Sequence, residues 1–234
     1  MDHGREIAKR GLEIGAIKFN FENPFTWASG FRMPIYNDNR LFLANPRDRR
    51  MISNGFKKII DREDIQYKVI AGTSTAGISP ATTLADSLFS PMIYVRDKPK
   101  EHGLRNSIEG IDAGVGLEGR KVILIEDLIS TGGSSAKAVQ AIRDAGGECG
   151  FCLSIFNYGF TQAEQMFKGE IPYDKENARF LETCQVISLL TYDVLIDVEK
   201  EEGYVTEEQV KMLDEWRTDP FGWGEKRGFA RVIK

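Results

Sequence analysis

The chain has 234 residues, 41% of them hydrophobic, which allows one domain with a substantial core and argues against extensive disorder. Its 31 basic and 35 acidic residues give a formal net charge of −4 with no basic block, which argues against a general nucleic-acid-binding protein. The charged N-terminus lacks the apolar segment of a secretory signal, and no apolar run approaches the ~18 residues that span a bilayer, so we expect a cytoplasmic protein without nucleic-acid or membrane partners.

The first 45 residues or so are expected to form a helix followed by an irregular segment. Apolar positions spaced as on one helix face predict a helix over residues 2–18. Residues 24–40 are rich in turn-forming types, with a short extended stretch around 33–36. A second helix is expected from Pro46 to about residue 61, with the proline near its start.

Residues from about 46 to 200 are expected to form the core, because short apolar strands alternate there with helices. Strands are predicted at 67–72, 91–96, 121–126, 149–156 and near 184–189, and helices at about 76–88, 133–145 and 191–200. Apolar strands of this kind are buried on both faces, which predicts an α/β fold with a doubly wound, mainly parallel sheet. We expect residues 1–234 to form a single domain.

The last part of the chain, from about residue 201 to 234, is expected to be a helical tail. Thr206 and Gln209 have the spacing of a capping box, which predicts that a helix begins at Thr206.

The three cysteines are Cys149, Cys152 and Cys184. The first two have C-x-x-C spacing, which could indicate a redox or zinc site. They fall in a predicted buried strand, where residues three apart are expected to point to opposite faces, and no second Cys or His pair completes a zinc site. We therefore interpret all three as buried core residues and predict no protein metal site.

The most informative stretch is VILIEDLISTGGSS, residues 122–135. Its predicted strand ends in Glu126 and Asp127, and a loop of glycines and hydroxyl residues then begins a helix. Ligands of open α/β sheets bind at this end of the strands. Backbone N–H groups and hydroxyls at a helix start suit a phosphate, and two carboxylates can hold a vicinal diol, so the combination predicts a ribose 5-phosphate site. The loop lacks the lysine of a P-loop and the spacing of a dinucleotide G-x-G-x-x-G motif.

A second group of residues lies between 94 and 110. Five basic side chains fall within ten residues, bounded by glycines: Arg96, Lys98, Lys100, His102 and Arg105. Cations on a loop of this kind indicate a lid that closes on a strongly anionic group, such as a pyrophosphate leaving group.

The acid pair and its loop resemble the PRPP (5-phosphoribosyl 1-diphosphate) motif of type I phosphoribosyltransferases. The R-x-K-x-K-x-H-G lid, the segment PFTWASGFRMPIYNDNR and the loop AGTSTAGI resemble orotate phosphoribosyltransferases in particular. The resemblance implies transfer of the phosphoribosyl group from PRPP to orotate, giving orotidine 5'-phosphate and pyrophosphate in de novo pyrimidine (UMP) biosynthesis. It also implies Mg²⁺ as cofactor, the type I fold with an N-terminal hood over the base, and a homodimer whose lid loops are shared across subunits.

The resemblance also implies site residues. Lys100, His102 and Asp127 are the implied catalytic residues, and Ser130, Tyr36 and Tyr158 are the implied orotate contacts. The implied PRPP-binding residues are Arg96, Lys98, Lys100, His102, Glu126, Asp127, Leu128, Ile129, Ser130, Thr131, Gly132, Gly133 and Ser134.

The chain departs from the family pattern at three places. Asp97 follows the lid arginine where many relatives have lysine, Ala28 replaces a lysine of the hood, and the stretch IFNYGF lacks the arginine that meets the orotate carboxylate. A purine phosphoribosyltransferase and a PRPP-sensing regulator are the alternative functions; the hood and lid patterns argue against the first, and the absence of a basic face from the sequence argues against the second.

Overall fold

The computed structural model describes residues 2–27, 29–97, 107–111 and 116–232. The chain divides into two compact units. The core unit is Leu43–Thr191, and the terminal unit combines Met1–Phe42 with Tyr192–Lys234. The segments expected as an N-terminal hood and as a C-terminal tail thus belong to one unit.

The core unit contains a six-stranded sheet in the order β10-β9-β8-β5-β6-β7. Its strands are β5 (Val69–Thr73), β6 (Met92–Val95), β7 (Ile108–Glu109), β8 (Lys121–Ile129), β9 (Glu148–Asn157) and β10 (Gln185–Thr191). The short β7 pairs antiparallel with β6, and the other neighbours are parallel. The predicted α/β fold with a mainly parallel sheet is confirmed.

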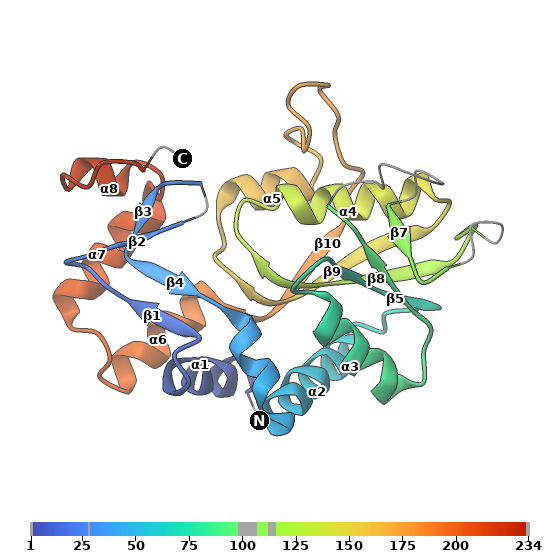
Figure 1. The fold of residues 1–234 in the computed structure, drawn as a ribbon, viewed down its shortest axis with the longest axis horizontal. Coiled ribbons are helices and arrows are strands. Elements are labelled where there is room, and N and C mark those ends of the chain that lie inside the picture. The colour runs from blue at the N-terminus through green and yellow to red at the C-terminus, as the bar shows by residue number, and fades with distance from the viewer. Residues whose placement is uncertain (1, 28, 98–106, 112–115, 233–234) are drawn as a thin grey trace. The chain divides into compact units, whose positions relative to one another are not determined.

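Helices cover both faces of this sheet, as Figure 1 shows for α2 and α3 on one side and α4 and α5 on the other. Their bounds are α2 (Pro46–Arg62), α3 (Ile78–Leu88), α4 (Gly133–Asp144) and α5 (Thr161–Phe167). All five residues of β5 are buried, as expected for a central strand packed on both faces. Three of the helices were predicted, and α5, which is one of the shortest and has no side-chain cap, was not.

The strand β8 is longer than predicted. Leu128 and Ile129, which we expected in the phosphate-binding loop, are its last two residues. They stay in the sheet because they continue the parallel ladder opposite Phe156 and Asn157 of β9. The loop is therefore confined to Ser130, Thr131 and Gly132.

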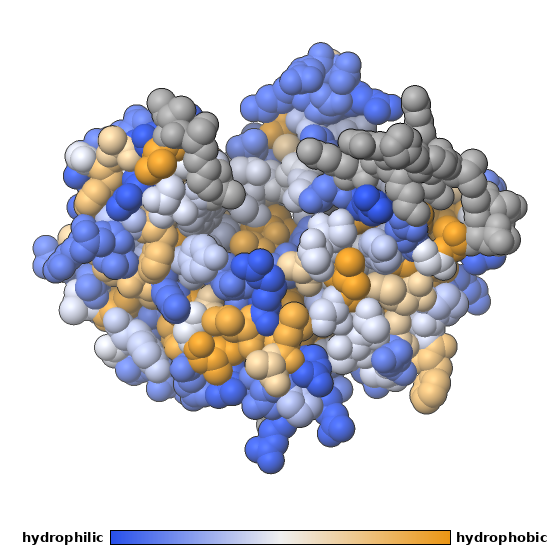
Figure 2. Space-filling model, viewed as in Figure 1, coloured by the Kyte–Doolittle hydropathy of each residue, from blue (hydrophilic) through white to orange (hydrophobic). Residues whose placement is uncertain are grey.

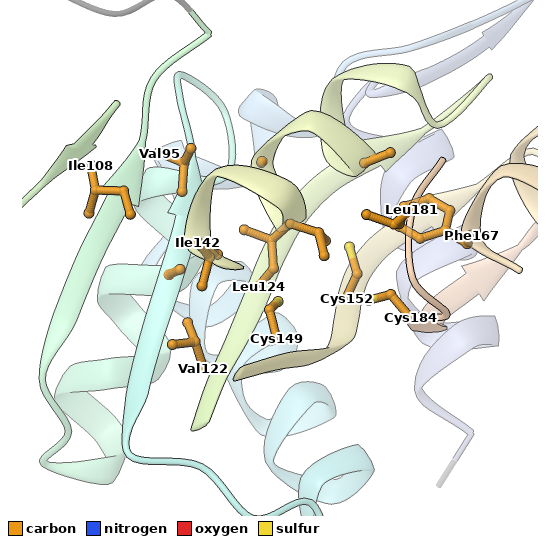
Figure 3. Packing of buried hydrophobic residues seen from close by; sticks show 14 of the residues in the cluster. Val95, Ile108, Val122, Leu124, Ile142, Cys149, Cys152, Phe167, Leu181 and Cys184 are labelled. Atoms are coloured by element: carbon orange, nitrogen blue, oxygen red, sulfur yellow. The ribbon is translucent and has the colours of Figure 1, made fainter. Parts of the chain in front are cut away.

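The three cysteines lie in one hydrophobic cluster, where all are buried and free (Figure 3). Their assignment to the core is confirmed, but the expectation that Cys149 and Cys152 point to opposite faces is wrong. Glu148 pairs with Lys121 and Phe151 with Ile123, so β9 carries one residue more than β8 over this stretch. This bulge rotates the strand and brings both thiols to the same face. A hydrogen bond with Cys184 lowers the pKa of Cys149, whereas burial raises the pKa of Cys152.

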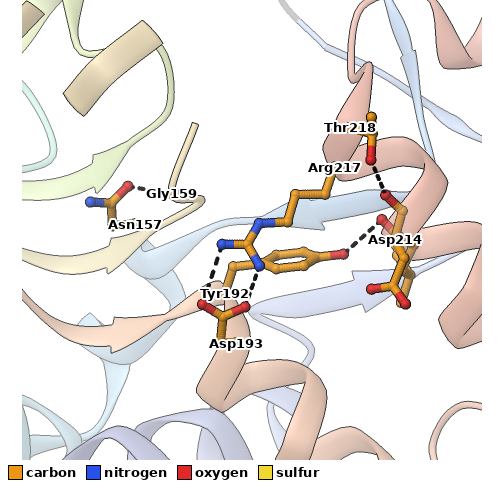
Figure 4. Close-up of polar contacts among 8 residues, drawn as sticks. Asn157, Gly159, Tyr192, Asp193, Asp214, Arg217 and Thr218 are labelled. Atoms are coloured by element: carbon orange, nitrogen blue, oxygen red, sulfur yellow. Dashed lines mark hydrogen bonds and ion pairs between the residues drawn. The ribbon is translucent and has the colours of Figure 1, made fainter. Parts of the chain in front are cut away.

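Between α5 and β10 the chain forms a long loop, tied by the bridge between Asp174 and Arg179. It projects from the core unit, and its surface is hydrophilic in Figure 2. Near the start of α5, the Asn157 side chain accepts a hydrogen bond from the Gly159 N–H at 2.8 Å (Figure 4).

The N-terminal part of the terminal unit begins with α1 (His3–Glu13), capped by the Asp2 carboxylate. The helix is shorter than the predicted 2–18, because Gly15 has a positive φ of 70° and the chain then enters β1. Two small antiparallel pairs follow, β1 (Ile17–Phe19) with β4 (Ile35–Asn37) and β2 (Phe25–Thr26) with β3 (Arg32–Met33). A 3-10 helix, η1 (Asn39–Ala44), leads to the core.

The C-terminal part of this unit consists of α6 (Tyr192–Glu201), α7 (Glu207–Thr218) and the short α8 (Trp223–Lys226). The capping box of Thr206 and Gln209 at the start of α7 is confirmed. Arg217 of α7 pairs with Asp193 and lies over the Tyr192 ring at 5.0 Å, which ties α7 to α6 (Figure 4). None of the helices in the described ranges is both long and apolar enough to cross a membrane.

Candidate active site

A cavity of about 640 Å³ lies in the core unit where β5, β6 and β8 end. One wall comes from the carboxyl end of β8 and the start of α4, with Glu126, Asp127, Leu128, Gly133 and Ser134. The facing residues come from the loop after β5 and from the two ends of the lid segment. All these strands are parallel, so their carboxyl ends meet at one edge, where ligands of such sheets bind.

Glu126 sits in the floor of this cavity with only 5% of its surface exposed. Three donors surround its carboxylate. The Thr73 hydroxyl donates to Oε1 at 2.7 Å, the Asp127 N–H donates to Oε1 at 3.0 Å, and the Ser135 hydroxyl donates to Oε2 at 2.7 Å. Glu126 therefore joins the end of β5 to the first turn of α4.

The same environment changes the charge of the acid pair. Burial, followed by the negative charge of Asp127, raises the pKa of Glu126 from 4.5 to about 8. The buried position of Glu126 thus disfavours a second full negative charge beside Asp127. Asp127, which is half-buried in the cavity wall, is the member of the pair that is open to a ligand.

The start of α4 has the features of an anion site. The residue before the helix is Gly132, with φ of 82° and no side-chain cap, so the N–H groups of the first turn have no capping acceptor from it. A Cβ at Gly132 would lie 3.2 Å from Phe167 and 3.3 Å from Ala163, and the left-handed conformation also favours glycine. The sequence therefore needs glycine here for both the turn and the packing of α5.

The opposite side of the cavity is the loop from Thr73 to Ala76, with a cis peptide bond between Ser74 and Thr75. Gly77 follows this loop and is tightly packed. A Cβ there would lie 2.3 Å from the Thr73 hydroxyl and 2.6 Å from the Ile125 carbonyl oxygen. The small residues of this loop were predicted to permit close approach of an anion, and the loop does line the cavity.

Arg96 directly follows the last residue of β6, and it lines the cavity with Asp97 and Ser107. Its guanidinium pairs with Glu109 of β7 at 3.3 Å. The remaining lid residues of the prediction, Lys98, Lys100 and His102, lie outside the described residues.

The other predicted residues do not line this cavity. Ile129 is buried and borders a separate cavity of about 560 Å³ beside α5. Tyr158 is only 1% exposed, and its ring stacks on Phe160. Tyr36 belongs to β4 of the terminal unit, where its ring contacts Phe25. Ser130, Thr131 and Gly132 form the turn between β8 and α4.

Lys137 and Tyr173 line the cavity but were not predicted from the sequence. Lys137 follows the loop on the same helix, so helical spacing could have indicated it, whereas no local pattern marks Tyr173. Thr73 and Ser135 belong to the two motifs described above, but their hydrogen bonds to Glu126 were not foreseen. Among the described residues, no group of three or more His, Cys, Asp or Glu could hold a metal ion.

Comparison with known proteins agrees with this geometry. The sequence matches the phosphoribosyl transferase domain family over residues 43–167, which lie inside the core unit. An orotate phosphoribosyltransferase of Listeria monocytogenes serotype 4b (strain F2365) is 42% identical over 221 residues, covering 94% of this chain and 98% of the relative. That of Cytophaga hutchinsonii is 43% identical over 223 residues, covering 95% and 99%.

A solved structure of orotate phosphoribosyltransferase from Aeropyrum pernix has the same fold, with a TM-score of 0.65 and 22% identity over 86% of this chain and 99% of that one. The family match extends over more than half of the chain, and the relatives match nearly all of it. The chain therefore belongs to the phosphoribosyltransferases and, among them, to the orotate phosphoribosyltransferase family.

Proposed function

We propose that this member of the orotate phosphoribosyltransferase family transfers the 5-phosphoribosyl group of PRPP to orotate, giving orotidine 5'-phosphate and pyrophosphate in de novo pyrimidine (UMP) biosynthesis. The observation that carries the proposal is the cavity of about 640 Å³ in which an acid pair, an uncapped helix start and the base of a cationic lid converge. These are the groups needed for a ribose, its 5-phosphate and a pyrophosphate.

In this proposal the 5-phosphate lies at the start of α4. Its oxygens accept hydrogen bonds from the N–H groups of Gly133 and Ser134, which line the cavity, and the positive end of the helix dipole adds to the attraction. The resemblance adds the preceding turn, Ser130–Gly132, to this contact set. The resemblance gives Leu128 and Ile129 a share of this contact set. Leu128 lines the cavity from the end of β8, whereas the buried Ile129 is limited to positioning the turn.

The ribose hydroxyls bind Asp127. Its carboxylate accepts hydrogen bonds from the diol and stabilises the positive charge that develops on the ring as the C1–oxygen bond to pyrophosphate breaks. Glu126 acts through Asp127. Its own oxygens are occupied by hydrogen bonds from Thr73, Ser135 and the Asp127 N–H, so it fixes the position of the neighbouring carboxylate.

The pyrophosphate lies against the loop from Thr73 to Ala76 and near Arg96. The resemblance adds Lys98, Lys100 and His102 from the lid. Cations there oppose the negative charge that accumulates on the leaving group, and Lys100 or His102 can protonate it. The lid also excludes water, so that orotate rather than water attacks C1.

The residues present fit Mg²⁺ bound mainly through substrate. Asp127 supplies one half-buried carboxylate in the cavity wall, and Mg²⁺ commonly keeps water and substrate oxygens as its other ligands. When bound, the ion neutralises charge on the pyrophosphate and ribose oxygens.

In this proposal orotate contacts Ser130, Tyr36 and Tyr158, as the resemblance implies. We also propose that the protein is a cytoplasmic homodimer in which each lid completes the partner's site. Three buried free cysteines are compatible with a reducing compartment.

The test is a spectrophotometric assay of the purified protein with PRPP, Mg²⁺ and one base at a time: orotate, uracil, adenine or hypoxanthine. We expect turnover with orotate alone. Turnover of a purine in place of orotate, or PRPP binding without turnover of any base, would refute the proposed function.

A further inference from the structure

Two cationic side chains among the described residues line the cavity, Arg96 and Lys137. Arg96 already pairs with Glu109 at 3.3 Å. Lys137 lies exposed on the second turn of α4, and within the described ranges no hydrogen bond or ion pair engages its ammonium group. Lys137 therefore brings an uncommitted positive charge to a cavity that receives a polyanion.

The position of Lys137 on α4 directs it toward the start of the helix. Ser134 is three residues before it and Gly133 four, so both share its face of the helix. Helical side chains lean toward the N-terminus, and a long one covers the turn before its own Cα. That turn is open, because a Cβ placed on Gly133 would meet nothing within 4 Å.

Asp174 in the projecting loop is an acid whose pKa the charge of Lys137 lowers. Its carboxylate accepts hydrogen bonds from the Asn177 side chain at 2.8 Å and from the N–H groups of Glu176 and Asn177 at 3.2 Å. These bonds come first in lowering its pKa, and the charge of Lys137 has the smallest effect. The Asp174 carboxylate is thus engaged by hydrogen bonds within its own turn, which leaves the Lys137 ammonium group available to a ligand.

A phosphate at the start of α4 needs this charge. The helix dipole supplies only about half an elementary charge, whereas a phosphate monoester near neutral pH carries nearly two negative charges. Asp127, in the same wall, repels it. A full positive charge one turn along the helix reduces this imbalance.

We propose that Lys137 is a substrate-binding residue that contacts the 5-phosphate of PRPP and of the nucleotide product, together with Ser134 and the first turn of α4. The inference rests on the proposed function and names a residue that the motif itself does not contain. It places Lys137 on the ribose 5-phosphate and not on the pyrophosphate, which lies at the facing wall.

The reverse reaction separates these two phosphates, because orotidine 5'-phosphate carries one and free pyrophosphate is the other substrate. For Lys137→Ala we expect the KM for orotidine 5'-phosphate to rise about tenfold, equivalent to about 1.4 kcal/mol, with the KM for pyrophosphate within about twofold of wild type. Lys137→Arg keeps the charge and should restore most of the affinity. Lys121→Ala, at the opposite end of β8, makes the same change in net charge and should leave both constants unchanged.

An unchanged KM for orotidine 5'-phosphate, or a larger rise in the KM for pyrophosphate, would overturn the assignment. If Lys137→Ala does not fold, as judged by circular dichroism, Lys137→Gln replaces it in the same comparison. Calorimetric titration with ribose 5-phosphate and, separately, with pyrophosphate tests the contact without turnover. A wild-type protein that does not interconvert the substrates would refute the proposed function, and weaker binding of ribose 5-phosphate alone by the Lys137 variant would still support the inference.

Discussion

Replacing Glu126 by alanine tests whether this residue holds the site together. The Thr73 and Ser135 hydroxyls both donate to the Glu126 carboxylate at 2.7 Å, and both residues are buried, with 6% and 1% exposed. In Glu126→Ala the Ser135 hydroxyl loses this acceptor, the Thr73 hydroxyl keeps only the long 3.5 Å contact with the Ile125 carbonyl oxygen, and the Asp127 N–H also loses its partner.

The size of the effect follows from these bonds. Leaving a buried donor without a partner costs about 1–3 kcal/mol, so two hydroxyls give a loss of about 2–6 kcal/mol in the free energy of unfolding. For a chain of this length each kcal/mol lowers Tm by about 2–4 °C. Glu126→Gln keeps an acceptor oxygen, and its amide can donate to Ser135, whose hydroxyl can rotate to accept. We expect this variant to lose no more than about 1 kcal/mol.

The measurement is thermal and urea unfolding followed by far-ultraviolet circular dichroism. Glu148→Ala is the matched control, since Glu148 is exposed at the other end of the neighbouring strand. An alanine variant that melts within a degree or so of wild type would show that the network does not stabilise the core. Equal losses in the alanine and glutamine variants would show that the hydrogen bonds are not the cause.

Three further predictions concern catalysis, assembly and pH. Asp127→Asn should fold normally but lower kcat by about 100-fold or more, and excess chelator should abolish wild-type turnover; near-normal rates in either assay would refute the roles proposed for Asp127 and Mg²⁺. Mixing Lys100→Ala with Asp127→Asn chains should restore about a quarter of wild-type activity if lids act across a dimer, whereas confirmed subunit exchange without recovery would refute the shared site. Burial raises the pKa of Glu199 from 4.5 to about 8, so its contribution to stability is complete below 4.5 and is lost as the pH rises to about 8. The difference in Tm between Glu199→Gln and wild type should therefore grow in favour of the variant from pH 5 to pH 8, and a constant difference would contradict this account.

Much of the fold could be predicted from the sequence because the core strands are apolar throughout and their helices are amphipathic. Pro46 and the Thr206 capping box marked two helix starts directly. The position of the acid pair at the edge of the sheet followed from the order of strand, loop and helix. The different roles of the two acids could not be predicted from the sequence, because the buried state of Glu126 depends on Thr73, 53 residues away.

The errors have local physical causes. The strand β8 continues past the acid pair because β9 offers partners to Leu128 and Ile129, which the sequence of β8 alone does not reveal. The bulge in β9 reversed the expected direction of one cysteine, and a bulge leaves no pattern in apolar residues. In the sequence Lys137 has the pattern of a solvated lysine on a helix, and only the fold places it beside the cavity.

The unit that contains both ends of the chain has a consequence for the order of events during synthesis. The Trp216 indole N–H contacts the Met33 sulfur at 3.1 Å across 183 residues of chain. At ribosomal rates of about 5–20 residues per second, roughly ten to forty seconds pass between the synthesis of Met33 and that of Trp216. Leu43–Thr191 is fully translated before α7 exists, so the core can fold first, while the apolar residues of the N-terminal segment still lack the surface that buries them. A nascent chain can therefore carry a folded core while its N-terminal segment still lacks the partners that bury its apolar side chains, and that segment is then the part most exposed to chaperones and proteases.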